Sequence, residues 1–359
     1  MINVTKSYLP PFEEYKYWLE KIWETSWLTN QGPLVTELEK RLKDALGVKN
    51  LLFVSNGTIA LLLAIKALEL KGEIITTPFS YVATTTSILW EDCEPVFADI
   101  DPKNFCLDPA QIEKLITKKT SAILATHVYG IPCAVEAIQE IAKKHNLKII
   151  YDGAHAFGVK YKNTSVFAYG DISTLSFHAT KLFHTIEGGA IIVQDDELFK
   201  KILLYRSFGH VGDDYFTMGI NAKNSEFHAA MGLCNLPKVN DFILQRKAIA
   251  NMYLSELHTM PLKFPEIPGY VEYNYSYFPV FFRNEKELLT VKNFLEANDI
   301  NTRRYFYPSL NKLPYVQSGN ECPVSQDLAK RVLCLPFYQQ LTKENVTFIC
   351  SLIKKMFEQ

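Results

Sequence analysis

Short apolar runs alternate with helical patterns between residues 51 and 193, and this alternation restricts the possible folds more than any other feature. The runs that we expect to form strands are 51–54, 73–76, 95–98, 121–125, 148–151, 174–177 and 190–193. Helical patterns over 58–68, 82–90, 109–118 and 133–145 separate the first five runs. Such an order predicts right-handed βαβ units and a mostly parallel sheet that helices cover on both faces.

The segments outside this region predict further helices and a second, smaller unit. Amphipathic helices are expected over 12–24 and 34–46. The chain reads as helical from residue 194 to about residue 256, apart from a polar loop over 219–226. The remainder predicts strands over 273–282 and near 301–305, with helices over 285–297 and 344–357. We therefore predict a large α/β domain over residues 1–256 and a small α+β domain over residues 257–359.

Composition and charge exclude several classes of partner. The chain has 359 residues, 48% of them hydrophobic, and its net charge is −1 without long blocks of either sign. Nucleic acid and acidic membrane surfaces are therefore not expected as partners. The N-terminus lacks the basic start and apolar run of a signal peptide, and no run of about 18 apolar residues predicts a membrane span. We expect a cytoplasmic protein.

The cysteines and histidines predict neither disulfides nor a metal site. Seven cysteines are scattered along the chain, and no two of them have Cys-x-x-Cys spacing. Most lie in apolar stretches, as buried reduced thiols do. The eight histidines show no metal-binding spacing, so no metal is assigned.

Chemically active side chains follow several of the predicted strands. In an open α/β sheet, ligands bind at the carboxyl ends of the strands. The segments that follow the strands are 55–58, 78–81, 127–129, 152–155 and 176–181. They supply a polar turn at a helix start, an aromatic ring, imidazoles, a carboxylate and a lysine. We expect these groups to form one site.

The turn Ser55-Asn-Gly-Thr58 opens a helix and offers free backbone N–H groups, which makes it a candidate anion site. Neither the dinucleotide-binding glycine fingerprint nor the P-loop motif is present, so a lone phosphate is a better ligand than a dinucleotide or nucleoside triphosphate. A plain helix cap is the alternative.

Lys181 lies in a polar turn between two strands that are expected to be buried, and Gly188 and Gly189 precede the second strand. A lysine that is removed from water has a lowered pKa and becomes an amine nucleophile toward carbonyl groups. The glycines allow a positive φ or a close approach of the backbone. The alternative is a lysine on a surface loop.

Asp152 ends an apolar strand, where an unpaired carboxylate is costly, so it should face a cation. That cation is either a structural Arg or Lys or the protonated ring nitrogen of pyridoxal phosphate, which needs such a carboxylate. Tyr81 offers a flat face for a ring, although a core tyrosine would look the same. His155 could bind a cofactor oxygen or pack in the core.

These residues stand within motifs that resemble the DegT/DnrJ/StrS family of pyridoxal-phosphate-dependent sugar aminotransferases. The matching segments are Gln31-Gly-Pro33, Ser55-Asn-Gly-Thr-Ile-Ala-Leu61, Thr77-Pro-Phe-Ser-Tyr-Val-Ala-Thr84, Tyr151-Asp-Gly-Ala-His-Ala-Phe-Gly158, Ser176-Phe-His-Ala-Thr-Lys181, Glu187-Gly-Gly189, Gly219-x-Asn221 and Leu335-Pro336. They follow the family order over nearly the whole chain. The resemblance implies the fold type I architecture of aspartate aminotransferase, with a mostly parallel seven-stranded sheet flanked by helices and a smaller C-terminal α+β domain.

The resemblance also implies roles for individual residues. Lys181 would bind the cofactor covalently and shuttle a proton, while Asp152 would pair with the pyridine nitrogen. The remaining cofactor contacts would come from Gly57, Thr58 and Ser176 at the phosphate, Tyr81 and His155 at the ring, and Asn221 from the other subunit of a homodimer with shared active sites. His155 stands where the family commonly has glutamine. Arg303, Tyr305 and Tyr307 are the implied nucleotide or sugar contacts, with a position on the surface as the alternative. His184 lies beside the lysine in the sequence, and it is either a substrate contact or a packed histidine.

The implied reaction moves an amino group from L-glutamate to a nucleotide-linked keto-6-deoxy sugar, with dTDP as the expected nucleotide and pyridoxal 5′-phosphate as the cofactor. The motif around Lys181 favours a 3-keto acceptor, and a 4-keto acceptor is the near alternative. A dehydratase, a cyclitol aminotransferase and a non-enzymatic regulator share the same core, but the lysine itself argues for amino transfer. A nicotinamide dehydrogenase is disfavoured because no glycine fingerprint follows the first strand.

Overall fold

The computed structural model describes residues 1–317 and 320–358. Its helices of more than three residues are α1 (Phe12–Thr25), α2 (Pro33–Leu46), α3 (Gly57–Ala67), α4 (Val82–Trp90), α5 (Pro109–Ile112), α6 (Val135–His145), α7 (Asp196–Arg206), α8 (Glu226–Asn235), α9 (Val239–Leu257), α10 (Glu285–Glu296), α11 (Pro323–Arg331) and α12 (Lys343–Phe357). Short 3-10 turns are η1 (Glu113–Leu115), η2 (Val128–Gly130), η3 (Val166–Ala168), η4 (Leu236–Lys238) and η5 (Leu310–Lys312).

The central element is a seven-stranded sheet with strand order β1-β9-β8-β5-β4-β2-β3. Its strands are β1 (Asn50–Val54), β2 (Glu73–Thr76), β3 (Glu94–Phe97), β4 (Thr120–Thr126), β5 (Lys148–Asp152), β8 (Ile172–Ser176) and β9 (Gly189–Val193). Strands β3, β2, β4, β5 and β8 pair in parallel, and β9 runs antiparallel to both of its neighbours. The predicted mostly parallel α/β sheet is confirmed.

Strand β9 begins with a close approach of backbones, as the paired glycines predicted. A Cβ atom on Gly189 would lie 2.5 Å from the carbonyl carbon of Asn56 and 2.7 Å from the carbonyl oxygen of Leu175. Any larger residue would therefore push β9 away from β8 and from the start of α3. The glycine lets these three segments meet at one edge of the sheet.

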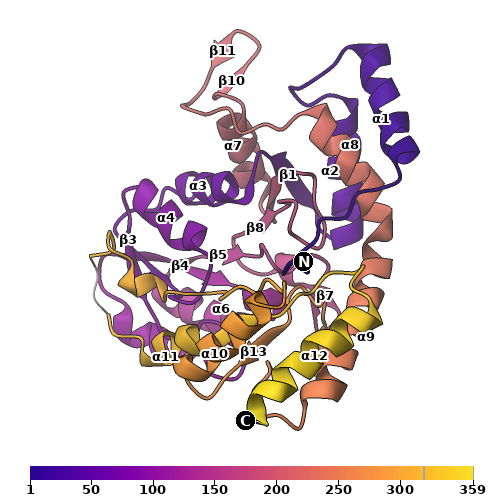
Figure 1. The fold of residues 1–359 in the computed structure, drawn as a ribbon. Coiled ribbons are helices and arrows are strands. Elements are labelled where there is room, and N and C mark those ends of the chain that lie inside the picture. The colour runs from indigo at the N-terminus through magenta and orange to yellow at the C-terminus, as the bar shows by residue number, and fades with distance from the viewer. Residues whose placement is uncertain (318–319, 359) are drawn as a thin grey trace.

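Smaller strands form three further sheets. They are β6 (Lys160–Tyr161) and β7 (Thr164–Ser165) with β12 (Val271–Glu272), the hairpin of β10 (His210–Val211) and β11 (Asp214–Tyr215), and β13 (Pro279–Phe281) with β14 (Val332–Cys334). The β10–β11 hairpin projects from the body of the molecule (Figure 1).

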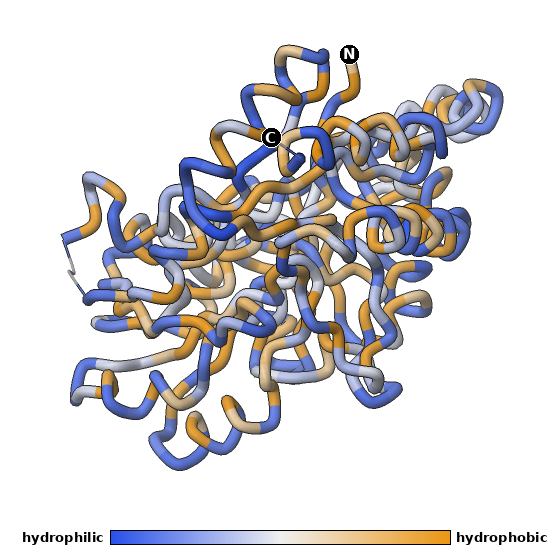
Figure 2. The backbone as a smooth tube through the Cα atoms, turned by 60° about the horizontal axis from the view of Figure 1, so that its bottom comes forward, coloured by the Kyte–Doolittle hydropathy of each residue, from blue (hydrophilic) through white to orange (hydrophobic). Residues whose placement is uncertain are grey.

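Helices pack against the sheet and enclose its cores. Along the helical coils of Figure 2, hydrophilic and hydrophobic residues alternate. In α2, Leu34, Val35, Leu38, Leu42 and Leu46 are buried at helical spacing. A separate core lies between the second half of α9, the sheet of β13 and β14, and helices α10 and α12. Helices α9 and α12 lie side by side (Figure 1). This core includes residues of α9 that precede residue 256, so it extends across the predicted domain boundary. The division at residue 256 stays a prediction.

Several predicted elements differ from the structure. The helix expected over 109–118 ends early, because Thr117 bonds locally: its amide donates to the hydroxyl of Thr120 at 2.9 Å. The helical reading of 194–256 is wrong after α7 ends at Arg206. Gly209 precedes the hairpin with a φ angle of 77°, and Gly212 lies in the turn of the hairpin with a φ angle of 59°.

The strands expected after residue 272 are shorter than predicted. Only Pro279–Phe281 of the stretch 273–282 forms a strand. Before it, the side-chain amide of Asn274 donates to the carbonyls of His155 and Phe157 in the turn after β5. Near residues 301–305 the structure has a single bridge between Arg303 and Cys334.

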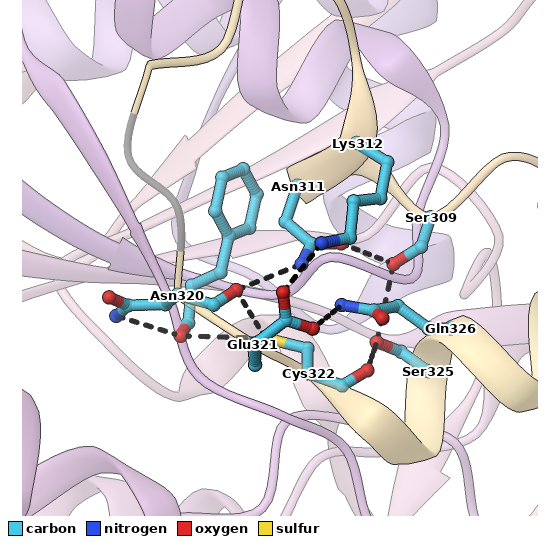
Figure 3. A network of polar contacts seen from close by, with 9 residues as sticks. Ser309, Asn311, Lys312, Asn320, Glu321, Cys322, Ser325 and Gln326 are labelled. Atoms are coloured by element: carbon cyan, nitrogen blue, oxygen red, sulfur yellow. Dashed lines mark hydrogen bonds and ion pairs between the residues drawn. The ribbon is translucent and has the colours of Figure 1, made fainter.

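A polar network fixes the segment that follows residue 308 (Figure 3). The side-chain amide of Asn311 donates to the carbonyl of Asn320 at 2.9 Å, and Lys312 pairs with Glu321 at 2.8 Å. The amide of Leu310 donates to the carbonyl of Pro78 at 2.8 Å. The segment is thereby tied to the turn between β2 and α4.

No helix of the described chain, residues 1–317 and 320–358, is long and apolar enough to span a bilayer. The expected cytoplasmic location stays a prediction.

Candidate active site

A cavity of about 540 Å³ lies at the carboxyl ends of the parallel strands. Of the residues singled out in the sequence, those that line it are Gly57, Thr58, Tyr81, Asp152, His155, Ser176, Lys181, Arg303 and Tyr305. The structure therefore brings together residues that lie more than 240 positions apart in the chain. Four of the five segments that follow the predicted strands meet in this cavity, whereas no residue of 127–129 lines it.

The first turn of α3 forms one end of the cavity. Asn56 caps this helix, and its side-chain oxygen accepts a hydrogen bond from the amide of Ile59 at 2.8 Å. The amides of Gly57 and Thr58 precede the first intrahelical bonds, so they are free to bind an anion. A Cβ atom on Gly57 would lie 2.9 Å from the Cβ of Ser176. Glycine thus allows the helix start and the Ser176 hydroxyl to share one pocket.

Asp152 is a buried carboxylate at the end of β5, with an exposed fraction of 6%. The hydroxyl of Thr84 donates to its Oδ2 at 2.8 Å, and the amide of Ala154 donates to its Oδ1 at 3.1 Å. Burial raises its pKa, while these hydrogen bonds and the charge of Lys181 oppose the rise. Among the described residues, no cationic side chain forms an ion pair with Asp152. The carboxylate therefore suits a cationic group of a ligand.

Lys181 extends from the turn after β8, and its amide donates to the carbonyl of His178 at 2.8 Å. Burial lowers the pKa of its amine, although the nearby Asp152 opposes this effect. A larger share of the amine is therefore neutral, and only the neutral form attacks a carbonyl group. The side-chain nitrogen lies 3.4 Å from the hydroxyl of Tyr277.

His155 is buried and neutral beside the cavity. Its Nδ1 accepts a hydrogen bond from the amide of Tyr129 at 3.3 Å, so the ring proton belongs on Nε2. Burial lowers its pKa well below the ordinary value. The ring stacks on Phe306, with centroids 5.5 Å apart. A neutral imidazole held in this way can donate one hydrogen bond to a ligand.

Tyr81 lies at the mouth of the cavity, where it is the N-cap residue of α4. Its side chain is 55% exposed, so it is not a core tyrosine. Its exposed ring is available to a flat ligand, and the proposed stacking stays a prediction.

Three of the implied contacts lie outside this cavity. His184 is buried with its Nε2 2.7 Å from the carbonyl of Tyr8, and its Nδ1 accepts the amide of Ile186 at 3.2 Å. Both ring nitrogens thus have hydrogen-bond partners within the chain. Tyr307 packs its ring under the guanidinium of Arg304 at 3.5 Å. Asn221 pairs with Ser207 in a β-bridge, and its predicted contact is to a neighbouring subunit.

Sequence reasoning missed several residues that belong to the site. Tyr277 and Phe306 line the cavity, and Thr84 holds Asp152. Tyr277 lies in an aromatic stretch whose pattern predicts a strand, and that pattern does not show where its hydroxyl points. Thr84 lies in the matching segment that ends at residue 84. The only sign in the sequence that it belongs to the site is its position three residues after Tyr81.

The fold and the site define a pyridoxal-phosphate-dependent aminotransferase of fold type I. A sequence model of the DegT/DnrJ/EryC1/StrS aminotransferase family matches residues 13–354, and the chain belongs to this family.

Known proteins resemble the chain over nearly its full length. It is 42% identical to dTDP-4-amino-4,6-dideoxy-D-glucose transaminase of Shigella dysenteriae, and the match covers 99% of each chain. The solved structure of DesI, determined in the presence of its TDP-sugar product, superimposes with a TM-score of 0.94 at 30% identity, covering 99% of this chain and 92% of DesI. NtdA from Bacillus subtilis with bound cofactor PMP has a TM-score of 0.90 at 27% identity, covering 97% of this chain and 82% of NtdA.

The cofactor of this family is pyridoxal 5′-phosphate, and the residues present fit it. The buried carboxylate of Asp152 lacks a cationic side-chain partner among the described residues. The start of α3 offers amides to a phosphate, and Lys181 offers an amine in the same cavity.

Proposed function

We propose that the chain transfers an amino group from L-glutamate to the C4 keto group of a dTDP-linked 6-deoxyhexose. The observation that carries this proposal is the shared cavity of Lys181 and Asp152, in which a buried amine faces the same space as a buried carboxylate. The family supports amino transfer to a sugar, and the choice of carbon and nucleotide is our own step.

When bound, the cofactor supplies a carbonyl carbon that carries the amino group and a ring that accepts electrons. In our proposal, Lys181 would hold the cofactor and move the proton at the reacting carbon. Asp152 would keep the ring nitrogen protonated, and the Nε2–H of His155 would donate to the ring oxygen. The amides of Gly57 and Thr58 and the hydroxyl of Ser176 would bind the phosphate.

Arg303 is the proposed contact for the negative charge of the substrates. It lines the cavity, and its backbone is fixed by a hydrogen bond from the amide of Cys334 at 2.8 Å. Its guanidinium lies 5.3 Å from the ring centroid of Tyr305, which also lines the cavity. No carboxylate pairs with Arg303 among the ion pairs of the described chain, so its charge is available to a carboxylate or a diphosphate.

The choice of C4 rests on the relatives. The motif around Lys181 favoured a 3-keto acceptor, whereas the Shigella dysenteriae relative is a transaminase named for a 4-amino-4,6-dideoxy sugar on dTDP. At 42% identity over the full chain, this relative supports the 4-keto alternative over the 3-keto preference. We therefore place the keto group at C4.

We also propose a homodimer in which Asn221 serves the cavity of the other subunit. The segment before Asn221 exposes several large apolar side chains, namely Phe208 (48%), Val211 (65%), Tyr215 (77%), Phe216 (64%) and Met218 (71%). They lie on and beside the β10–β11 hairpin, which projects from the body (Figure 1). An apolar projection of this kind is suited to burial against a second copy.

The proposal is tested by supplying purified protein and pyridoxal 5′-phosphate with L-glutamate and either the 4-keto or the 3-keto form of dTDP-6-deoxyglucose. We expect an amino sugar only from the 4-keto acceptor, with the amino group assigned to C4 by NMR, and none with Lys181→Ala. Amination of the 3-keto sugar alone would reverse the choice of carbon. No product with any nucleotide sugar would remove the proposal.

A further inference from the structure

The hydroxyl of Tyr277 reaches the amine of Lys181 from a part of the chain 96 residues further on. The two atoms are 3.4 Å apart, and Lys181 donates the hydrogen bond in its charged form. Tyr277 follows α9, whereas Lys181 follows β8 of the central sheet. The contact thus joins the residue that performs the chemistry to a segment outside the sheet.

The backbone that carries Tyr277 is anchored to the turn after Asp152. The side-chain amide of Asn274 donates to the carbonyl of His155 at 2.8 Å and to that of Phe157 at 2.9 Å. The hydroxyl of Ser276 also donates to the carbonyl of His155. From α9, the guanidinium of Arg246 donates to the carbonyl of Ser276 at 3.0 Å. These bonds fix the position from which the Tyr277 ring extends.

The ring of Tyr277 is held on several sides by other rings. Its centroid lies 4.9 Å from that of His155, 5.6 Å from that of Tyr305 and 5.8 Å from that of Tyr129. Burial raises the pKa of its phenol, so the hydroxyl keeps its proton at neutral pH. The structure therefore presents an intact O–H group at a fixed place beside Lys181.

We propose that Tyr277 is a positioning residue that holds the amine of Lys181 toward the cavity. This inference rests on the proposed function, in which Lys181 is the amine that binds the cofactor. A lysine side chain is long and flexible, and a reacting amine must be held in one place to react quickly. A phenol hydroxyl can accept from the charged amine or donate to the neutral one, so the contact persists in both protonation states.

The test measures how fast the apoprotein captures pyridoxal 5′-phosphate covalently, followed by absorbance in a stopped-flow instrument from pH 7 to pH 10. Equilibrium binding of pyridoxamine 5′-phosphate, which cannot react with the lysine, is measured alongside. The variant Tyr277→Phe removes only the hydroxyl. The control Tyr273→Phe removes a nearby hydroxyl that donates to the carbonyl of Tyr129 at 2.9 Å and does not meet Lys181.

We expect Tyr277→Phe to slow capture about fivefold or more across this pH range, the effect of losing one hydrogen bond of about 1 kcal/mol. Binding of pyridoxamine 5′-phosphate should stay within about twofold of wild type, and Tyr273→Phe should capture at the wild-type rate.

Unchanged capture by Tyr277→Phe would overturn the inference. A parallel loss of pyridoxamine 5′-phosphate binding, or equal slowing by Tyr273→Phe, would also overturn it, because either result indicates a general packing role. If the wild-type apoprotein captures no pyridoxal 5′-phosphate, the proposed function itself fails. That failure would be seen in the wild-type protein alone, whereas the outcomes that overturn the inference are seen only by comparing the variants with wild type.

Discussion

The hydroxyl of Thr84 lies 2.8 Å from Oδ2 of Asp152 and joins helix α4 to the end of strand β5. Behind it, the hydroxyl of Ser80 lies 2.8 Å from that of Thr84 and 3.1 Å from that of Thr126. All four side chains are buried. This chain of hydroxyls offers hydrogen bonds to a carboxylate that would otherwise be poorly solvated, and so favours its charged form.

Thr84→Val should therefore weaken cofactor binding. The substitution removes the hydrogen bond to Asp152 and raises the pKa of the carboxyl further, which reduces its attraction for a protonated ring nitrogen. We expect the dissociation constant of pyridoxamine 5′-phosphate to rise about tenfold, equivalent to about 1.4 kcal/mol. Isothermal titration of the apoprotein measures it. Thr84→Ser keeps the hydroxyl and should stay near wild type, and equal losses in both variants would contradict the role of the hydroxyl.

His127 should make the apoprotein sensitive to acid. Its ring is fully buried, its Nδ1 accepts the amide of Cys133 at 3.0 Å, and burial lowers its pKa from 6.5 to about 3. Between these values the unfolded chain binds a proton that the folded chain does not, so stability falls as the pH drops below 6.5. The loss approaches several kcal/mol near pH 3.

The variant His127→Asn keeps an acceptor for Cys133 but cannot be protonated. It should flatten the dependence of the unfolding free energy on pH between 6.5 and 4.5, measured by urea denaturation. Some slope should remain, because burial also lowers the pKa of His155. The control His258→Asn changes an exposed histidine and should keep the wild-type slope. A slope in His127→Asn as steep as in wild type would count against the buried neutral ring.

Replacing Lys181 by methionine should stabilise the apoprotein at neutral pH. Burial lowers the pKa of this lysine below 10.5, and this effect exceeds the attraction of Asp152. Between the folded-state pKa and 10.5 the unfolded chain holds a proton that the folded chain lacks, so stability rises with pH through that window and the full cost is present below it. Lys181→Met should unfold at a higher urea concentration than wild type at pH 7, with a smaller difference at pH 10.

The exposed Lys286, changed in the same way, provides the control and should show no such convergence. If Lys181→Met were no more stable than wild type at pH 7, the amine would be better solvated than its surroundings indicate.

The positions along the chain of the seven strands of the central sheet, and the residues that follow them, could be predicted from the sequence because both depend on local patterns. Apolar runs, the turn before Thr58 and the glycines near residue 189 each act within a few residues. The path of residues 208–220 could not be predicted, because it depends on a close contact between Gly209 and Thr217 that no local sequence pattern indicates. A Cβ atom on Gly209 would meet the carbonyl oxygen of Thr217 at 1.8 Å, which only the folded loop reveals.

The site shows the same limit. Lys181 follows β8 and Asp152 ends β5, so both could be found by position. Tyr277, in contrast, reaches the cavity only because Asn274 and Ser276 bond to the turn after Asp152. The position of His184 three residues after Lys181 fitted both a substrate contact and a packed histidine, and the turn directs its ring toward Tyr8. The direction of a side chain in a loop is set by tertiary contacts, and the spacing of residues in the sequence does not reveal them.

The proposed exchange of Asn221 between subunits predicts that two inactive variants rescue each other. Lys181→Ala lacks the amine in its own cavity, and Asn221→Ala lacks the amide that it supplies to its partner. In a mixed dimer, the Lys181→Ala subunit supplies Asn221 to the cavity of the Asn221→Ala subunit, which retains Lys181. One complete site results, so a randomised equal mixture should regain about a quarter of wild-type activity if Asn221→Ala is inactive alone.

The mixture is prepared by unfolding and refolding the two variants together, with the same variants refolded separately as controls, and aminated product is measured by mass spectrometry. A cavity completed within one subunit would give no gain on mixing, because each chain would carry its own defect. Phe216→Asp on the projecting hairpin should weaken the dimer, since its side chain is 64% exposed and a buried charge opposes association. Adding Phe216→Asp to both partners should therefore abolish the rescue, which ties the recovered activity to assembly and not to residual activity of either chain.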